Sequence, residues 1–190
     1  MQKQLFLLIS LCAILIFLLG CTGKTEEYHA HTDFKMIIEG ELFDFNKVQY
    51  MSSPYRPLSE NVHMHDFNPN VIHFHDKKAT LGDFFTSIGM VLSKDCIDTG
   101  SDTFCSGENG TLQMYVNGVR SEQFQEHKPK DLDKILILYG PIASAQDINI
   151  LTDQSCIYSE KCEPPEGFEL PDESCSVGEP CTLEEDQASK

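Results

Sequence analysis

Histidines at alternating positions place the strongest constraint on how this chain can fold. Residues 62–76 read VHMHDFNPNVIHFHD and contain two His-x-His pairs, and a third pair, HAH, occupies residues 29–31. A spacing of two residues places both side chains of a pair on the same face of a β-strand, with the intervening residues on the other face. The pairs therefore predict strands with a face of imidazoles and, in residues 62–76, an opposite face that is apolar.

The two pairs of this longer segment are predicted to meet in a hairpin. With a three-residue loop at 68–70, His65 lies opposite His73 and His63 lies opposite His75. A loop of odd length keeps all four rings on one face, whereas an even loop separates the pairs. Directly opposed residues have Cβ atoms about 4.5–5.5 Å apart, so three or four of these rings are expected to share one metal ion.

Neutral imidazole binds zinc, copper, nickel or iron rather than magnesium or calcium, and Zn–N bonds of about 2.0–2.1 Å fit such pairs. Asp33 shares a strand face with the 29–31 pair and is expected to ligate the metal or to orient a ring. Asp66 and Asp76 fall on the other face and are expected in turns. The predicted ligands of copper or zinc are His29, His31, His63, His65, His73, His75 and Asp33. Ordinary polar pairs and a pH-responsive surface stay open as alternatives, and the isolated His127 is expected at the surface.

Other segments predict further strands up to residue 151. FKMIIEGELFDF (34–45) reads as two strands around a Glu-Gly turn, and LQMYVNGVRSEQF (112–124) reads as a hairpin with an Asn-Gly turn. KILILYG (134–140) reads as a buried last strand. Asn109 begins an Asn-Gly-Thr tripeptide directly before residues 112–124, which fits a glycosylation acceptor or a plain turn.

One short helix is predicted at TLGDFFTSIG (80–89). Thr80 and Asp83 form a capping-box pattern, and the apolar residues recur at helical spacing, as expected of a face in the core. The predicted fold class for residues 29–151 is α+β: a mostly antiparallel sheet built of hairpins with one short helix. A β-grasp-like arrangement, in which the helix covers one face of the sheet, fits this order of elements.

The N-terminal segment has the pattern of an export signal. Residues 1–20 hold an apolar run that is short for a membrane span, and they end in Leu-Leu-Gly before Cys21. This ending resembles a lipobox, which predicts a lipidated Cys21 followed by a linker through residue 28. The alternative is an uncleaved anchor helix. Both readings predict an exported protein that is anchored to the outer face of the cell membrane.

Cysteine usage agrees with export, because an even number of cysteines in an exported chain indicates disulfides. The cysteines after the N-terminal segment are Cys96, Cys105, Cys156, Cys162, Cys175 and Cys181. Residues 96–105 are expected to form a polar loop closed by a disulfide. The zinc alternative lacks the C-x-x-C spacing that most such sites use.

Residues 152–190 are expected to form an acidic, cysteine-rich tail that is stapled by disulfides. An imperfect repeat, DQSCIYSEKC and DESCSVGEPC, supplies two C-x5-C units, and their four cysteines allow three pairings. Residues 153–190 contain eleven acidic residues and two lysines, hence a net charge of −9 out of −16 for the whole chain. This charge argues against a nucleic-acid partner, which requires clustered Lys and Arg.

Together, HAHTDFKMIIEGELFDF, the two later His-x-His pairs, MYVNG, DLDKILILYG and CIYSEKC resemble a family of small, secreted, histidine-rich archaeal proteins. Members of this family are often labelled protein-disulfide isomerases, and the resemblance implies that activity. The spacings argue otherwise, because a thiol oxidoreductase uses a low-pKa cysteine pair, usually C-x-x-C. Only Lys161, beside Cys162, hints at an activated thiol.

The sequence therefore favours an anchored lipoprotein that binds a transition metal through its histidines, without deciding whether it is an enzyme. A thiol–disulfide oxidoreductase, a metal-assisted hydrolase and a structural cell-surface protein are the alternatives. The expected partners are the membrane and the metal ion, and the sequence does not identify any protein partner.

Overall fold

We describe a computed structural model of the chain, which places residues 28–140 and 151–170. The predicted signal, Cys21, and the second cysteine pair of the tail, Cys175 and Cys181, lie outside the described residues. Among the described residues, no helix is long and apolar enough to cross a membrane.

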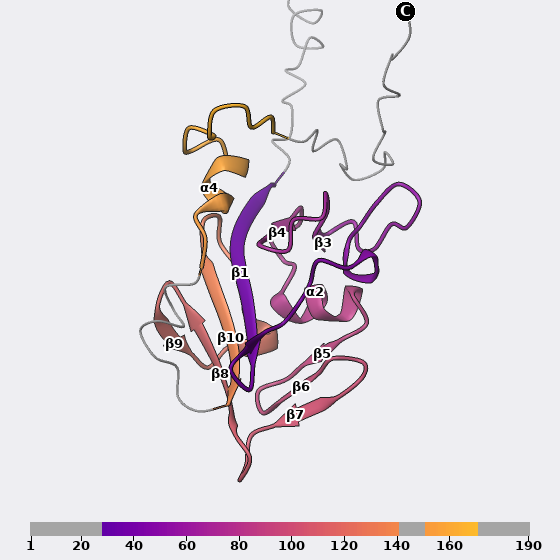
Figure 1. The fold of residues 1–190 in the computed structure, drawn as a ribbon, viewed down its shortest axis with the longest axis vertical. Coiled ribbons are helices and arrows are strands. Elements are labelled where there is room, and N and C mark those ends of the chain that lie inside the picture. The colour runs from indigo at the N-terminus through magenta and orange to yellow at the C-terminus, as the bar shows by residue number, and fades with distance from the viewer. Residues whose placement is uncertain (1–27, 141–150, 171–190) are drawn as a thin grey trace, which may run out of the picture.

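A seven-stranded sheet forms the frame of the fold. Its strands are β1 (Ala30–Ile38), β2 (Glu41–Leu42), β3 (Val62–His63), β4 (Val71–Phe74), β8 (Thr111–Val116), β9 (Val119–Ser121) and β10 (Lys134–Gly140). The order across the sheet is β3-β4-β1-β10-β8-β9, and β2 pairs with β1. All pairs in this sheet are antiparallel except β1 with β10, which run in parallel through its centre (Figure 1).

The predicted turns form as expected. Glu39 and Gly40 both adopt positive φ between β1 and β2, and Asn117 and Gly118 do so between β8 and β9. Positive φ at both central residues matches the right-handed twist of a two-residue hairpin. The prediction of a hairpin around each dipeptide is confirmed.

A second, smaller sheet contains β5 (Val91–Leu92), β6 (Cys96–Asp98) and β7 (Thr103–Cys105). Cys96 and Cys105 are cross-strand partners and form a disulfide, as predicted. The prediction of a loop over these residues is wrong, because the segment between the cysteines pairs with itself as a hairpin. The segment is mostly polar, so its composition did not indicate that Ile97 is buried and Phe104 partly buried in a hairpin.

Helix α2 (Leu81–Ser87) begins at Thr80, and the capping box with Asp83 is formed in both directions. The helix packs its buried apolar face against one side of the large sheet. That side carries the intervening residues of the histidine strands, namely Val62, Met64, Ile72 and Phe74. The predicted apolar face of these strands is therefore confirmed.

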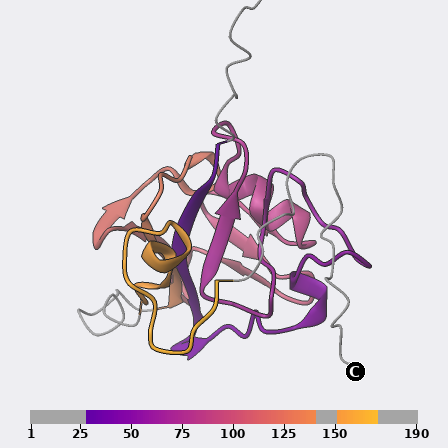
Figure 2. The same ribbon diagram turned by 90° about the horizontal axis from the view of Figure 1, so that it is seen from above.

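The other side of the sheet carries helix α4 (Gln154–Tyr158), which packs against β1. Figures 1 and 2 both show α4 and α2 on opposite sides of β1. Sequence analysis did not predict α4. Two short 3₁₀ helices, η1 (Val48–Tyr50) and η2 (Phe124–Glu126), complete the elements of the described residues. At the coarse level the prediction holds, with a mostly antiparallel sheet and one short helix within residues 29–140.

His127 was predicted at the surface, and that prediction is wrong. Its ring is buried, with Nδ1 2.8 Å from Gln123 Oε1 and Nε2 3.7 Å from Asp133 Oδ2. Asp133 also accepts hydrogen bonds from the Lys130 N–H and the Asn117 side chain. Burial opposes ionisation of Asp133, but His127 and these hydrogen bonds outweigh it and lower its pKa.

We expect Asp133 to contribute a measurable part of the acid dependence of stability. A carboxyl whose pKa is lowered by folding stabilises the native state above its unfolded pKa of about 3.9. That contribution is lost as the pH falls through the lower, folded value. Asp133→Asn should reduce the free energy of unfolding at neutral pH and flatten its decline below about pH 4. Urea unfolding between pH 3 and 7 measures both effects, and parallel curves for the two proteins would contradict the assignment.

Candidate metal centre

Six of the seven histidines lie on the α4 side of the sheet, across three adjacent strands. His31 in β1 pairs with His73 in β4, and His63 in β3 pairs with the same His73. His29 directly precedes β1 and His75 directly follows β4, and their ring centroids lie 4.4 Å apart. The sheet therefore gathers the three His-x-His pairs into one place, which we call the histidine cluster.

The predicted register of the hairpin is wrong by two residues, because His63 rather than His65 lies opposite His73. The turn begins earlier than expected. Asp66 and Phe67 both adopt positive φ, and the Asn68 N–H donates to the His65 carbonyl at 3.1 Å. A shift of two residues preserves the face of every side chain, and the four rings stay together as predicted.

Ring separations within the cluster are short throughout. The centroid of His73 lies 4.0 Å from that of His65, 4.8 Å from that of His31 and 6.0 Å from that of His29. On the β3 side, the His63 ring lies 4.9 Å from that of His75. These distances place six imidazoles in one continuous group with His73 near its centre.

Three of the rings form a group suited to one metal ion. His29, His31 and His73 each offer a ring nitrogen, and these three atoms all lie within 4.8 Å of one another. Ligand nitrogens around a tetrahedral zinc lie about 3.4 Å apart, as Zn–N bonds of about 2.05 Å require. Binding of an ion therefore requires the three rings to move closer together by side-chain rotation.

Comparisons with protein-family models, with curated proteins and with solved structures found no match to this chain. The chemistry of the cluster is therefore inferred from its own geometry.

Oxygen acceptors hold the Nδ1 atoms of two cluster residues. His63 Nδ1 lies 2.7 Å from the Ser59 carbonyl oxygen, and His65 Nδ1 lies 2.6 Å from Asp66 Oδ2. Because a carbonyl or carboxylate oxygen only accepts, both Nδ1 atoms must carry the proton. In the neutral rings Nε2 then has the lone pair that a metal requires. Metal-binding histidines commonly have this kind of support on the second ring nitrogen.

His31 receives the same support from the tail. Its Nδ1 lies 2.8 Å from the Ser159 hydroxyl oxygen, and that hydroxyl donates to the Asp131 carboxylate. The Ser159 proton is thereby used, so its oxygen accepts from His31 Nδ1. Asp131 also accepts from the His31 backbone N–H at 3.0 Å and pairs with the Lys161 ammonium. Burial alone would raise the pKa of Asp131, but these hydrogen bonds outweigh it and lower the pKa.

Asp33, predicted as a ligand or as an orienting residue, has a different role in the structure. It is fully buried, and its carboxylate accepts from the Thr152 hydroxyl, the Gln154 N–H and the Ser155 hydroxyl. These donors lie at the N-terminal end of α4, where a carboxylate satisfies the unpaired N–H groups. Asp33 thus fixes α4 to the sheet.

Helix α4 in turn covers the cluster with Tyr158. The tyrosine ring lies edge-on to His73, with centroids 5.2 Å apart, and 5.8 Å from His31. Its hydroxyl accepts a hydrogen bond from Asn68 at 3.0 Å. The cluster is consequently shielded on the side of β1 and β4 by a segment that lies more than eighty residues away in sequence.

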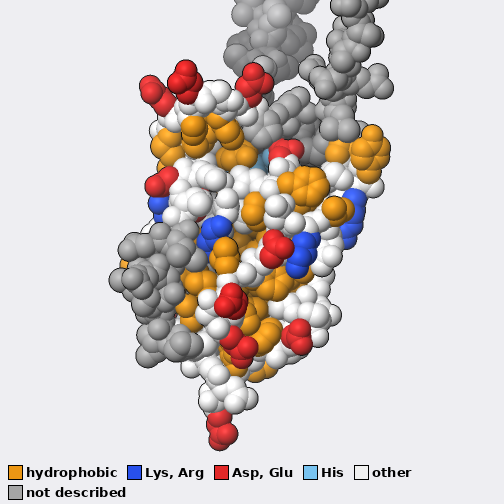
Figure 3. Space-filling view, in the orientation of Figure 1, with side chains coloured by type: hydrophobic (Ala, Val, Ile, Leu, Met, Phe, Trp, Pro, Cys, Tyr) orange, Lys and Arg blue, Asp and Glu red, His pale blue; other side chains and the backbone are white. Residues whose placement is uncertain are grey.

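A hollow of about 430 Å³ adjoins this cover. It is lined by Asp66, Phe67, Asn68, Pro69, Asn70, Gln154, Ile157, Tyr158, Pro165 and Phe168. Asp66 and Tyr158 each contact a cluster histidine as well, so the hollow reaches the edge of the cluster. Acidic side chains project from the end of the molecule at which α4 lies (Figure 3). Exposed Glu160, Glu163 and Glu166 belong to this segment, and their charge favours the approach of cations.

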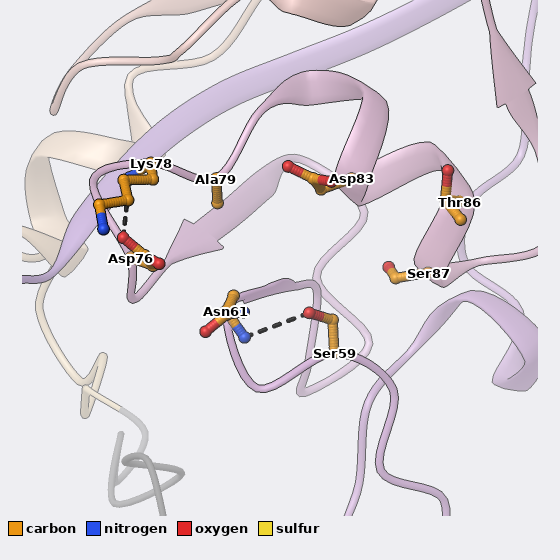
Figure 4. A pocket seen from close by; sticks show the side chains of 8 residues that line it. All are labelled: Ser59, Asn61, Asp76, Lys78, Ala79, Asp83, Thr86 and Ser87. Atoms are coloured by element: carbon orange, nitrogen blue, oxygen red, sulfur yellow. Dashed lines mark hydrogen bonds between the residues drawn. The ribbon is translucent and has the colours of Figure 1, made fainter.

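A second hollow, of about 360 Å³, lies beside α2. It is lined by Ser59, Asn61, Asp76, Lys78, Ala79, Asp83, Thr86 and Ser87 (Figure 4). Its carboxylates serve local structure: Asp76 accepts from the Lys78 N–H at 2.8 Å, as predicted for a turn residue, and Asp83 caps α2. The carboxylates of this hollow are thus used in a turn and a helix cap, and it is a weaker candidate for a binding site than the histidine cluster.

The remaining predicted sites lie apart from the cluster or belong to the α4 segment that covers it. Cys156 and Cys162 form a disulfide that closes the turn after α4, which carries Ser159. Lys161, the hint of an activated thiol, pairs its ammonium with Asp131 instead. Asn109 is exposed in the turn between β7 and β8.

Sequence reasoning missed the supporting residues Ser59, Asp66, Asp131, Tyr158 and Ser159. Asp66 had a visible signal, because it directly follows a histidine in the HMHD motif, but regular strand geometry assigned it to the wrong face. Asp131, Tyr158 and Ser159 lie far from their partners in sequence, and Ser59, four residues before His63, contributes its backbone carbonyl, which no side-chain pattern marks.

Proposed function

We propose that this protein is an exported, membrane-anchored lipoprotein that binds a transition metal ion, copper or zinc, in the histidine cluster. One observation carries the proposal: nitrogens of His29, His31 and His73 converge within 4.8 Å on a sheet face. Three imidazoles suit these metals far better than hard cations, which prefer oxygen ligands.

The support around the ligands strengthens the proposal. Nδ1 of His31 is held by Ser159, whose hydroxyl is fixed by Asp131. A ring fixed in this way loses little freedom when it binds a metal, and such outer partners raise metal affinity by about 10–100-fold. Polar surface pairs, the plainer alternative, do not require buried and braced rings, whereas His31 and His73 are almost completely buried.

Export and anchoring rest on the N-terminal pattern of residues 1–21 and on the disulfides, which persist in oxidising compartments. We also propose a β-grasp-like arrangement for the sheet. The central order β4-β1-β10-β8, the parallel pair β1 and β10, and the single helix α2 across one face support it.

Metal analysis of the untagged protein tests the proposal. After incubation with Zn²⁺ or Cu²⁺ and removal of free metal, we expect at least one tightly bound ion per chain. The combined variant His29→Ala, His31→Ala and His73→Ala should lose the ion held by these rings. His127→Ala removes a buried histidine outside the cluster and should keep the wild-type metal content. A metal content near zero in the wild-type protein would overturn the proposal.

A further inference from the structure

Three cluster histidines, His63, His65 and His75, remain beside the group formed by His29, His31 and His73. We call His29, His31 and His73 the first group and the remaining three histidines the second group. Within the second group, the His63 ring lies 4.9 Å from that of His75 and 5.5 Å from that of His65. The separations within the first group are similar, with His31 at 4.4 Å from His29 and 4.8 Å from His73. His63 thus lies between His75 and His65 in the second group, as His31 lies between His29 and His73 in the first.

The second group is also oriented for coordination. Nδ1 of His63 donates to the Ser59 carbonyl and Nδ1 of His65 donates to Asp66, so both rings offer Nε2 as the ligand atom. His65 Nε2 is buried and has no hydrogen-bond partner among the described residues. A buried nitrogen lone pair without a donor costs free energy, which a bound cation would offset.

Each group has a carboxylate of its own. Asp66 contacts His65 directly in the second group, and Asp131 supports His31 through Ser159 in the first. A carboxylate that accepts from a ligand histidine makes the imidazole more basic and offsets part of the metal charge. Each group of histidines therefore has the kind of outer partner that metal-binding histidines commonly have.

We propose that the second group binds a second transition metal ion, so that the histidine cluster is a dinuclear centre with three imidazoles per ion. The inference rests on the proposed function, because both ions belong to the same class. It goes further by assigning three ligands to each ion, with His73 of the first group next to His65 of the second.

The number of zinc ions bound per chain distinguishes the dinuclear centre from the proposed function alone. The full chain, purified without a tag, is freed of metal and titrated with Zn²⁺, and bound zinc is measured by elemental analysis and by calorimetry. We expect two zinc ions per chain. One ion would overturn the dinuclear centre and leave the proposed function standing, whereas none would overturn both.

Variants then assign the ions to the groups. His63→Asn with His65→Asn removes both Nε2 ligands but retains an amide near Nδ1 that can donate to Ser59 and Asp66. We expect this double variant to bind one zinc ion and to keep the wild-type unfolding temperature without metal. His29→Asn with His31→Asn should also leave one ion, and all four substitutions together should leave none. Two ions retained in the first double variant would refute the assignment of the second group, as would the loss of both.

Discussion

Replacing His73 by alanine should lower the affinity of the protein for its first metal ion by at least about 100-fold, more than the loss of an outer partner costs. The reason is the central position of this ring. It belongs to the first group, and its centroid lies 4.0 Å from that of His65 in the second. With His73 removed, only two imidazoles of the first group remain as ligands for that ion. Competition with a chelator of known affinity measures the change.

The fold should survive this substitution, because the packed residues of β4 point the other way. Ile72 and Phe74 belong to the core beneath α2 and keep their contacts. His127→Ala is the matched control, since it deletes a buried imidazole at a site away from the cluster. We expect the control to be less stable, through loss of the contact with Asp133, and to bind metal normally. Equal affinities for the wild type and His73→Ala would show that the metal binds elsewhere.

The face of every cluster histidine could be predicted from sequence, because side-chain direction in a strand depends only on parity. The register could not. Positive φ at two consecutive non-glycine residues, Asp66 and Phe67, is uncommon, and no sequence signal distinguished this turn from a loop at 68–70. An error of two residues changed which rings face one another, His63 instead of His65 opposite His73, without dispersing the cluster.

Most features of the site that the sequence did not predict depend on contacts between segments that are distant in sequence. The parallel pairing of β1 with β10 brings the segment before β10, including Asp131, beside His31. No periodicity within either strand specifies its partner, because both are almost completely buried and their side-chain pattern marks faces and not neighbours. Asp33 shows the same limit: its strand face was correctly deduced, but its neighbours on that face come from α4 and not from a metal site.

Asp33→Ala should release α4 from the sheet and is expected to have the largest effect on stability. The carboxylate is fully buried and accepts hydrogen bonds from Thr152, Gln154 and Ser155. Its removal leaves these donors without an acceptor, which is expected to lower the free energy of unfolding by about 2–4 kcal/mol. Urea unfolding of the metal-free protein measures this change.

The same substitution should also speed the exchange of metal, because α4 carries Tyr158 over His31 and His73. Transfer of zinc to an excess of chelator, followed over time, should be faster in Asp33→Ala than in the wild type. Asp153→Ala is the matched control: this acid stands at the start of α4, but it is exposed and makes no capping hydrogen bond. Its ion pair with Lys134 lies at the surface, where such pairs contribute about 0–1 kcal/mol. If Asp33→Ala lost stability without faster zinc release, α4 would be a structural support and not a cover that controls access to the cluster.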